Sequence, residues 1–309
     1  MTVRVAVIGP NGTLGPPIIT RLLEESSIDL TLLTRHATKT AQQYPLLHDK
    51  IVVTDYSSNP QLTQLFRDHG FDVLVILINR HELEPQLRLI DAACAVGGLH
   101  VLPSSFGVNT AELEVRRLPQ MKEKIEMEQY LAAKAEKGEV SFTAVNTGLF
   151  FDWALGSFMI PQSQNQPFMI ADAGTTRVSA TTLSDIGCAV ASAILKRHDP
   201  QVRNKFLFVH STVFTQRQIL AYAKEAAPER EFKVFTIDTE AAAKQAWRQY
   251  EAGERNMDSL RGMMLRTTFG LELGMFSEVA NDVLGLKMLT EDEVKELVAK
   301  YARRSVGMA

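Results

Sequence analysis

Residues 5–25 read VAVIGPNGTLGPPIITRLLEE, a β-branched run followed by a glycine-rich turn and an amphipathic stretch. The run over Val3–Ile8 predicts a buried strand, and Pro16–Glu25 predicts a helix with proline in its first turn. Between them, the glycines follow a G-x-x-G-x-x-G spacing, at Gly9, Gly12 and Gly15. A strand, a glycine-rich turn and a helix in this order are typical of a domain that binds a dinucleotide.

The glycine-rich turn has a physical task at each of its glycines. The first permits the tight turn, the second lets the backbone approach a pyrophosphate, and the third lets the helix pack closely on the sheet. Unpaired N–H groups at the helix N-terminus would then face the phosphates. The alternative is a glycine-rich turn without a ligand. We expect phosphate contacts from Gly9, Asn11, Gly12, Thr13, Leu14 and Gly15.

The end of the second predicted strand, Leu30–Thr34, indicates which dinucleotide is bound. NAD enzymes usually carry Asp or Glu about 20 residues after the glycines, to accept a hydrogen bond from the ribose 2′-OH. Here Arg35 follows the strand, with Lys39 close behind and no carboxylate at the strand end. Because a guanidinium can pair bidentately with a 2′-phosphate, the sequence favours NADP(H) over NAD(H). The alternative is that Arg35 is only a solvated loop cation.

Strands and helices alternate up to about residue 150, which predicts an α/β fold with a Rossmann-type, doubly wound parallel sheet. After that point the rhythm breaks, and we expect a smaller α+β substrate domain. We therefore divide the chain into 1–150, which binds the dinucleotide, and 151–309, which binds the substrate, with some later segments returning to the first domain. Further strands are predicted over Ile51–Thr54, Val73–Ile78, His100–Pro103, Ser141–Asn146, Lys205–Val209 and Phe232–Ile237. Further helices are predicted over Pro60–His69, Gln86–Val96, Met121–Lys137, Thr182–Lys196, Thr215–Ala227, Thr239–Glu251 and Thr290–Tyr301.

Composition and short motifs exclude several classes of function. The net charge of −3 gives no reason to expect nucleic-acid binding. No apolar run reaches the ~18 residues that a membrane span needs, and the N-terminus has no signal-peptide pattern. The two cysteines, Cys94 and Cys188, lie in apolar helical stretches and read as buried thiols in a reducing compartment. The seven histidines show no metal-binding spacing. We expect a cytoplasmic monomer or homodimer without a metal.

Several segments together resemble one family. GPNGTLG is similar to the GATGxxG loop, and LPSSFG at Leu102–Gly107 to IPSEFG, of the NmrA-like and isoflavone-reductase-like branch of atypical short-chain dehydrogenases. KIEMEQYL, NTGLFFDW and RVSATTLSDIGCAVASAIL resemble later segments of that family. The resemblance covers nearly the whole chain. It implies a Rossmann domain and a smaller substrate domain, with the active site in the cleft between them.

The resemblance also points to a catalytic lysine. Ordinary short-chain dehydrogenases use YxxxK, but here Gln120 stands four residues before Lys124, so that tyrosine is missing. Tyr130 lies on a different face of the helix and is no substitute. Lys124 matches the lysine of the reductase branch, with Lys122 as the nearby competitor. In an apolar cleft Lys124 could act as general acid or base, or hold the nicotinamide ribose. A solvated helix lysine is the alternative.

The ends of other strands supply further candidates, because ligands bind at the carboxyl edge of such a sheet. We expect Phe106 to pack on the nicotinamide, Asn79 to lie near the ribose or nicotinamide, and Asp55 to touch the adenine amino group. Ser104 and Ser105 are candidate donors to a substrate carbonyl, or only cap a turn. Ser105 stands where relatives carry Glu. Three aromatic residues either pack in the core or wall a flat apolar pocket: Phe150, Phe151 and Trp153.

These features favour an NADPH-dependent reductase. Its substrate is expected to be an apolar, aromatic or alkaloid-like small molecule with a C=O, C=N or conjugated C=C group, in secondary metabolism. An NADP(H)-sensing regulator without turnover is the alternative from a different class, motivated by the missing tyrosine and by Ser105. A third reading is an NADP(H)-dependent cyclisation or redox isomerisation in natural-product biosynthesis.

Overall fold

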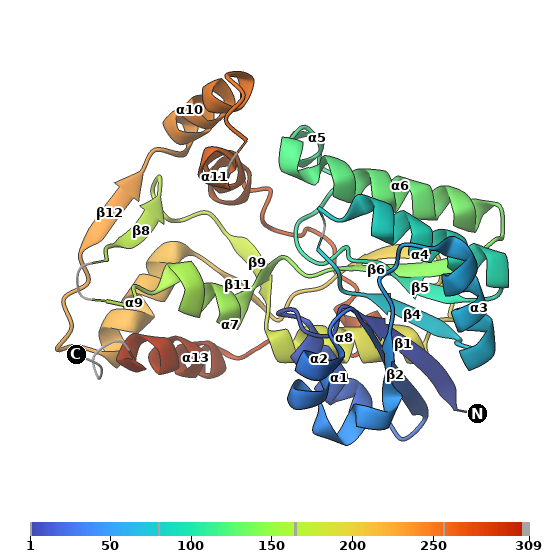
Figure 1. Cartoon of the computed structure of the whole chain (residues 1–309). Coiled ribbons are helices and arrows are strands. Elements are labelled where there is room, and N and C mark those ends of the chain that lie inside the picture. Colours follow the sequence, from blue (N-terminus) through green and yellow to red (C-terminus); the bar gives the residue numbers. More distant parts are fainter. Residues whose placement is uncertain (1, 80, 164–165, 256, 305–309) are drawn as a thin grey trace.

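The computed structural model describes residues 2–79, 81–163, 166–255 and 257–304. Within that part of the chain, the largest sheet has seven parallel strands in the order β10-β6-β5-β4-β1-β2-β3 (Figure 1). This is the doubly wound arrangement that the sequence predicted. The strands are β1 (Val3–Ile8), β2 (Ile28–Thr34), β3 (Ile51–Val53), β4 (Val73–Ile76), β5 (His100–Leu102), β6 (Ser141–Asn146) and β10 (Lys205–Phe208).

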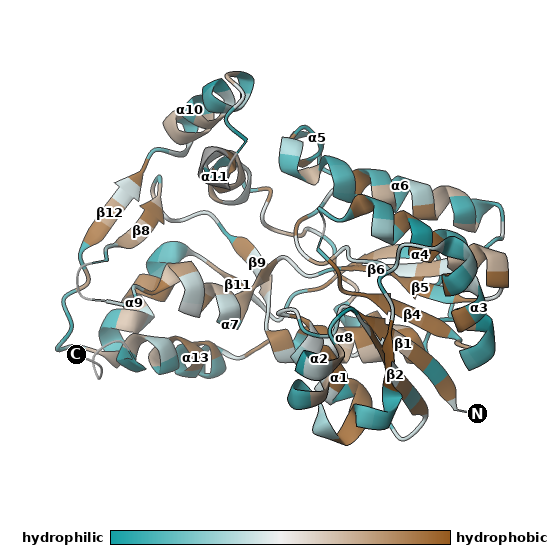
Figure 2. Cartoon of the chain, in the orientation of Figure 1, coloured by the Kyte–Doolittle hydropathy of each residue, from teal (hydrophilic) through white to brown (hydrophobic). Residues whose placement is uncertain are grey.

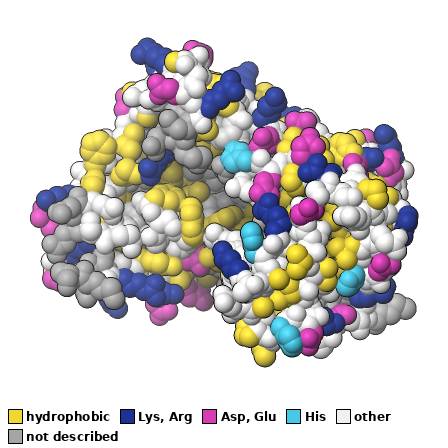
Figure 3. Space-filling view, in the orientation of Figure 1, with side chains coloured by type: hydrophobic (Ala, Val, Ile, Leu, Met, Phe, Trp, Pro, Cys, Tyr) yellow, Lys and Arg dark blue, Asp and Glu magenta, His cyan; other side chains and the backbone are white. Residues whose placement is uncertain are grey.

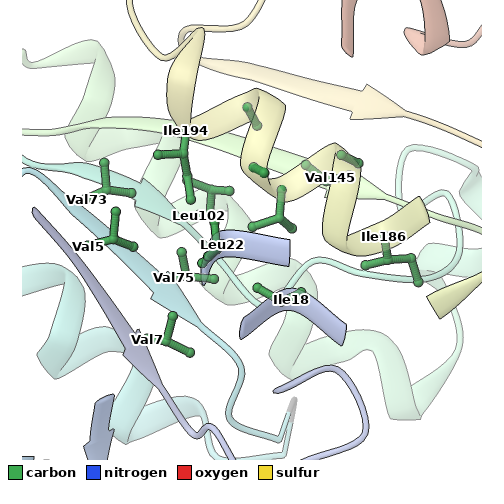
Figure 4. Close-up of a cluster of buried hydrophobic side chains, with 14 of the residues drawn as sticks. Val5, Val7, Ile18, Leu22, Val73, Val75, Leu102, Val145, Ile186 and Ile194 are labelled. Atoms are coloured by element: carbon green, nitrogen blue, oxygen red, sulfur yellow. The ribbon is translucent and has the colours of Figure 1, made fainter. Parts of the chain in front are cut away.

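Helices cover both faces of this sheet. Successive residues of β1 point to opposite faces, so Val5 and Val7 pack with α1 (Gly15–Leu23) and α8 (Leu183–Leu195) in one core, which Figure 4 shows. Ala6 and Ile8 pack on the other side, against α3 (Asn59–His69), α4 (Leu83–Val96) and α6 (Lys122–Glu136). Strand β4, in the middle of the sheet, is buried on both faces and is therefore apolar along its whole length (Figure 2).

The second half of the chain contributes to this sheet before it forms its own region. Strand β10 pairs with β6, and α8 packs on α1 so closely that a Cβ at Gly187 would lie 2.6 Å from the Pro17 carbonyl oxygen. The remaining elements form a smaller α+β region beside the sheet (Figure 1). Its strands are β7 (Leu149–Phe150), β8 (Phe168–Ala171), β9 (Val178–Thr181), β11 (Thr212–Phe214) and β12 (Val234–Ile237). Its helices are α7 (Phe151–Ala154), α9 (Gln216–Ala226), α10 (Thr239–Glu251), α11 (Met257–Leu265) and α13 (Glu291–Arg304). Helix α12 (Asn281–Leu284) instead packs on α8 in the core of the large sheet.

A small apolar cluster joins the two regions away from the sheet. Val115 of α5 (Leu113–Arg116) and Met121 pack with Ala246 of α10 and Met263 of α11. This contact places α11 beside α5, which precedes α6, with β8 on the other side of α11 (Figure 1). The space between these elements contains the larger of the two cavities considered below.

Most predicted elements are present, with boundaries that differ by a few residues. The predicted helix at Gln86 already begins at Leu83, and the predicted strand at Phe232 begins at Val234. Thr290 and Glu293 form a capping box at the start of α13: the Thr290 N–H donates to Glu293 Oε2 at 2.7 Å, and the Glu293 N–H donates to Thr290 Oγ1 at 3.3 Å. The stretch predicted to be loop-rich after residue 150 contains α7 and a short π-helix over Leu155–Met159. Helix α2 (Ala37–Gln43) was not predicted.

Candidate active site

The glycine-rich turn has the geometry that its sequence predicts. Gly9 has a φ of +80°, a backbone conformation that favours glycine. A Cβ at Gly15 would lie 1.7 Å from the Pro10 carbonyl oxygen, so only glycine fits there. A Cβ at Gly12 would meet no atom closer than 3.9 Å. Gly12 and Thr13 are exposed at the start of α1, while Leu14 is half-buried. The backbone at Gly12 is therefore open to a ligand.

A cleft of about 190 Å³ lies beside this turn, between the ends of β1, β2 and β4. This is the point where the strand order reverses, and it is where doubly wound sheets bind ligands. The structure therefore brings together five of the predicted cofactor residues. The cleft is lined by Gly9, Asn11, Gly12, Thr34, Arg35, His36, Tyr56, Leu77, Ile78, Asn79 and Glu82.

Arg35 is held at the mouth of this cleft by a residue that the sequence did not indicate. Its guanidinium lies 3.1 Å from a carboxylate oxygen of Glu82 and 5.8 Å from the ring centre of Tyr56. The Tyr56 hydroxyl donates to the Leu33 carbonyl at 2.9 Å, and burial raises the pKa of Tyr56 to about 12. The tyrosine is therefore a fixed, neutral platform beneath the cation. No local signal marks Glu82, which lies just before α4.

Two of the predicted cofactor residues that do not line this cleft, Lys39 and Asp55, are exposed. Lys39 is exposed on α2 and does not line it. Asp55 is also exposed, and its carboxylate accepts hydrogen bonds from the Ser57 hydroxyl at 2.7 Å and the Ser57 N–H at 2.9 Å. These bonds hold the pKa of Asp55 below its usual range. The structure therefore shows Asp55 closing a local turn.

Two buried oxygen atoms suit the cleft for a ligand with hydrogen-bond donors. Asn11 donates through Nδ2 to Thr40 Oγ1 at 2.8 Å, but its Oδ1 has no partner among the described residues. Glu82 Oε2 likewise has none within the described chain. With the open backbone at Gly12 and the cation at Arg35, this donor and acceptor set fits the ribose and phosphates of an NADP(H) molecule.

A loop after β5 connects this cleft to the second half. Ser104 Oγ donates to the Ile78 carbonyl at 3.0 Å, beside the cleft. At the other end of the loop, the Gly148 N–H donates to the Gly107 carbonyl at 3.0 Å, next to Leu149. The loop therefore spans the carboxyl edge of the large sheet from the end of β4 to the end of β6. Within it, Ser105 is fully buried, and Phe106 is half-buried against the core.

Lys124 fastens this loop to α6. Its ammonium group donates to the Ser105 carbonyl at 2.7 Å and to the Val108 carbonyl at 3.5 Å. It also lies 3.8 Å from Glu128, whose other oxygen accepts from Thr110 Oγ1 at 2.6 Å. Lys124 is only 3% exposed, which excludes the solvated lysine considered from the sequence. Lys122, the competing candidate, is exposed.

A second, apolar pocket of about 410 Å³ begins at Leu149, next to the Gly148 residue that bonds the far end of the loop. Figure 3 shows hydrophobic side chains gathered in the hollow between the two halves of the molecule. Among the described side chains that line the pocket, Arg261 is the single charged one. The lining consists of Gln120, Leu149, Trp153, Phe158, Met159, Phe168, Met169, Ala171, Gln216, Ile237, Leu260, Arg261, Met264, Leu265 and Thr268.

The three predicted pocket aromatics have different locations. Trp153 lines the apolar pocket, is 45% exposed, and has its ring centre 6.0 Å from that of Phe158. Phe150 is half-buried and packs against the core, with its ring centre 6.5 Å from that of Trp153. Phe151 is fully buried against Phe214, so the expectation that it lines the pocket is corrected. Adjacent residues at the start of α7 point in different directions, and Phe151 points into the core.

Neither a metal site nor a membrane-spanning helix is present among the described residues. In the described part of the chain, no three His, Cys, Asp or Glu side chains are grouped so that they could hold a metal ion. No helix formed by the described residues has the length and apolar character needed to span a membrane.

Comparison with known proteins places the chain among related sequences and folds. The model of the NmrA-like family matches residues 1–246. The chain is 28% identical to the protein named oxidoreductase aprR of Aspergillus flavus, over 97% of this chain and 100% of that protein. A solved leucoanthocyanidin reductase–NADPH complex from Vitis vinifera is 18% identical, with a TM-score of 0.76 over 97% of this chain and 99% of that one. A structure described as AtPrR2 with NADP+ and (+)pinoresinol is 17% identical, with the same TM-score and coverage. The two solved structures share the fold of this chain.

Proposed function

The chain belongs to the NmrA-like family, and from that premise we propose that it is an NADP(H)-dependent oxidoreductase acting on an apolar small molecule. One observation carries this proposal. A polar cleft with a cation lies at one end of the loop after β5, and an apolar pocket begins at Leu149, next to the residue that bonds the other end of that loop. The named oxidoreductase relative and the NADP(H)-bound structural relatives support the same reading.

The polar cleft would hold the adenosine half of the cofactor. The exposed backbone at Gly12 and the N-terminus of α1 would bind the pyrophosphate. Arg35 would exchange its bond to Glu82 for bonds to the ribose 2′-phosphate. Asn79 is exposed after β4 and lines the cleft, so it would lie near the nicotinamide half of the cofactor, which follows the pyrophosphate. NADPH supplies a hydride ion when it is bound, and the residues of this chain supply its orientation.

The loop after β5 would position the reacting end of the cofactor. Because Lys124 fixes the carbonyls of Ser105 and Val108, the geometry supports a positioning role for this lysine. Its action as general acid or base remains a prediction. Phe106, in the middle of the same loop, would pack on the nicotinamide. The Ser104 hydroxyl already donates to the Ile78 carbonyl, so in the ligand-free protein this side chain has a structural role.

The apolar pocket would hold the substrate. Its volume of about 410 Å³ and its wall of aromatic, methionine and leucine side chains suit a ring compound of drug-like size. The wall would also exclude water from the reacting atoms. We therefore propose an aromatic or alkaloid-like compound of secondary metabolism, with a C=O, C=N or conjugated C=C group that accepts the hydride. The names of the structural relatives, which include pinoresinol and leucoanthocyanidin, agree with this class.

Calorimetry with NADPH and NADH tests the proposal directly. The protein should bind NADPH more tightly than NADH, and Arg35→Ser should remove most of that difference. Oxidation of NADPH, followed by its absorbance, should then depend on an added aromatic ketone, imine or conjugated alkene. Absence of NADPH binding would refute the proposal.

A regulator that binds NADP(H) without turnover is the second candidate. It is favoured by one observation, the engagement of the Lys124 ammonium with main-chain carbonyls and Glu128. This candidate predicts unequal affinities for NADP+ and NADPH and no oxidation of NADPH with any substrate class. The same calorimetric and absorbance measurements therefore separate the two functions.

A further inference from the structure

Gln120 differs from the other polar side chains at the apolar pocket. It lies just before α6, lines the pocket and is only 5% exposed. Neither its side-chain nitrogen nor its side-chain oxygen has a hydrogen-bond partner among the described residues. A buried amide without partners has lost its hydrogen bonds to water and gained none in return.

Gln216, the other glutamine at this pocket, shows the contrast. Its Oε1 accepts from the Ala171 N–H at 2.8 Å, and its Nε2 donates to the Met169 carbonyl at 3.1 Å. That amide is used by the fold, because it ties α9 to β8. Gln120 makes no such tie, so the fold gives no reason for a polar residue there. Unsatisfied buried groups in native proteins call for a partner that the protein itself does not supply.

We propose that Gln120 binds the polar function of the substrate, a carbonyl or hydroxyl oxygen on an otherwise apolar ring compound. The proposal rests on the proposed function in one respect, since it takes the apolar pocket to be the substrate site. The neighbouring wall offers mainly apolar groups, from Trp153, Phe158, Met169, Met264 and Leu265. A single oxygen function placed at Gln120 would therefore fix the orientation of the whole molecule.

Gln120 lies close along the chain to Lys124, the residue that anchors the loop after β5. Gln120 precedes Lys124 by four residues, about one helical turn, and Lys124 holds the carbonyls of Ser105 and Val108. An amide carries both a donor and an acceptor. Gln120 can therefore donate to a carbonyl oxygen and accept from a hydroxyl group, so it can bind a substrate in either oxidation state. An amide does not exchange a proton with its ligand, so we assign it binding and not acid catalysis.

Two probes that differ by one oxygen atom test this assignment. 2-Acetonaphthone carries a carbonyl, and 2-ethylnaphthalene has the same ring and chain length without it. We expect the wild-type protein to bind the ketone at least about tenfold more tightly in calorimetric titrations. Gln120→Met keeps the side-chain length but removes the amide, and it should bind both probes alike. Met264→Leu, an apolar change in the same wall, should keep the preference for the ketone.

Thermal unfolding gives a second readout. Because the ligand-free protein leaves the Gln120 amide unpaired, Gln120→Met and Gln120→Leu should unfold at the same temperature as wild type or higher. A purely structural glutamine would give lower unfolding temperatures in both variants, which would overturn the proposal. Equal binding of the two probes by wild type, or a ketone preference that survives in both variants, would also overturn it. So would a failure of both probes to bind.

NADPH titrations of the same proteins keep the two proposals apart. Binding of NADPH without discrimination between the probes would refute the role of Gln120 and leave the cofactor assignment intact. If the protein distinguished the probes through Gln120 but did not bind NADPH, the role of Gln120 would be supported and the cofactor assignment refuted. Gln120→Met should leave NADPH affinity unchanged, because Gln120 does not line the cofactor cleft.

Discussion

The guanidinium of Arg35 lies 3.1 Å from the carboxylate of Glu82, 47 residues further along the chain, across the mouth of the cofactor cleft. Arg35 is the group that we expect to bind the 2′-phosphate, so the protein carries a built-in competitor for it. Both side chains are partly exposed, at 44% and 32%, so the pair is worth only about 0.2–1 kcal/mol. A 2′-phosphate with two charges and three acceptor oxygens can displace such a partner.

Glu82→Gln should therefore strengthen binding of NADPH. Releasing Arg35 from the ion pair is expected to raise the affinity by up to about fivefold, with little change for NADH. Calorimetry at low salt is the appropriate measurement, because salt screens the pair. Glu84→Gln is the matched control: it removes an exposed carboxylate of α4 that lies 3.5 Å from Arg88 instead. Weaker NADPH binding by Glu82→Gln would mean that Glu82 itself contacts the cofactor.

The glycine-rich turn allows folding and binding to be separated by two alanine substitutions. Gly12→Ala places a Cβ in open space, with its nearest neighbours at 3.9 Å, so stability should change by less than about 1 kcal/mol. The added methyl group stands where a phosphate would approach, and NADPH affinity should fall at least about tenfold. Gly15→Ala would press a Cβ against the Pro10 carbonyl and should destabilise the protein itself.

Urea unfolding and NADPH titration of both variants check this pair. The expected pattern is a folded Gly12→Ala protein with weak cofactor binding and a destabilised Gly15→Ala protein. Full NADPH affinity in Gly12→Ala would show that the pyrophosphate does not lie against this turn.

The sequence predicted the fold well where the determining signals are local. The strand, turn and helix over Val3–Leu23 are adjacent in the chain, and each has its own pattern of apolar residues or glycines. The same holds for the apolar strand β4 and for the capping box at Thr290. Elements that depend on distant partners were missed. Strand β8 is one example, because it pairs with β12, more than 60 residues further along the chain.

In the candidate site, too, features set by local sequence signals were predicted and features set by distant contacts were not. The positions of Gly9, Gly12, Arg35 and Asn79 around one cleft follow from the rule that ligands bind at the carboxyl ends of parallel strands. The pairing of Arg35 with Glu82 does not, because it depends on how the loop after β4 folds back. Composition also could not show which of the three aromatic residues after β6 line the pocket and which pack in the core. Their directions depend on the start of α7, which buries Phe151 and exposes Trp153.

Because Phe151 is buried and Trp153 is half-exposed at the pocket, alanine variants of these two residues should have opposite phenotypes. Phe151→Ala removes a fully buried ring and should lower the free energy of unfolding by about 3–5 kcal/mol. Trp153→Ala removes a half-exposed side chain at the pocket and should cost much less stability, while weakening the binding of 2-acetonaphthone. Urea unfolding and calorimetry measure the two effects. Comparable losses of stability in both variants would contradict the placement of Trp153 at the pocket.

Lys124→Met tests whether this lysine positions the loop. The change removes the bonds to Ser105 and Val108 and leaves the buried Glu128 carboxylate without its cation, so stability should fall by about 3–5 kcal/mol. NADPH affinity should fall as well, because the loop loses its anchor. A lysine that acts only as acid or base would lose turnover while stability and NADPH affinity stay unchanged. Lys122→Met, at an exposed position of the same helix, should leave stability, NADPH affinity and turnover unchanged.

His100 makes the stability of the sheet depend on pH. It is 2% exposed, with Nδ1 2.9 Å from Ser141 Oγ and Nε2 2.9 Å from Thr143 Oγ1. Because Thr143 Oγ1 donates to the Val202 carbonyl at 2.9 Å, its oxygen accepts from Nε2–H, and Nδ1 is the acceptor for Ser141. The ring is therefore neutral and satisfied. Burial, reinforced by the charges of Arg203, Arg197 and His198, lowers its pKa to about 3.

His100→Gln should therefore flatten the pH dependence of unfolding in mildly acidic solution. The folded-state pKa of His100 lies below the unfolded value of about 6.5, so between these values the unfolded chain binds a proton that the folded chain does not. Stability from this residue is complete above pH ~7 and falls as the pH decreases, by about 2 kcal/mol between pH 7 and pH 5. Urea unfolding at both pH values should show this extra loss in wild type and not in His100→Gln. His210, whose pKa is also lowered by burial, contributes in the same direction to both proteins, so the difference between them isolates His100. An equal loss in the two proteins would mean that His100 is not held neutral in the fold.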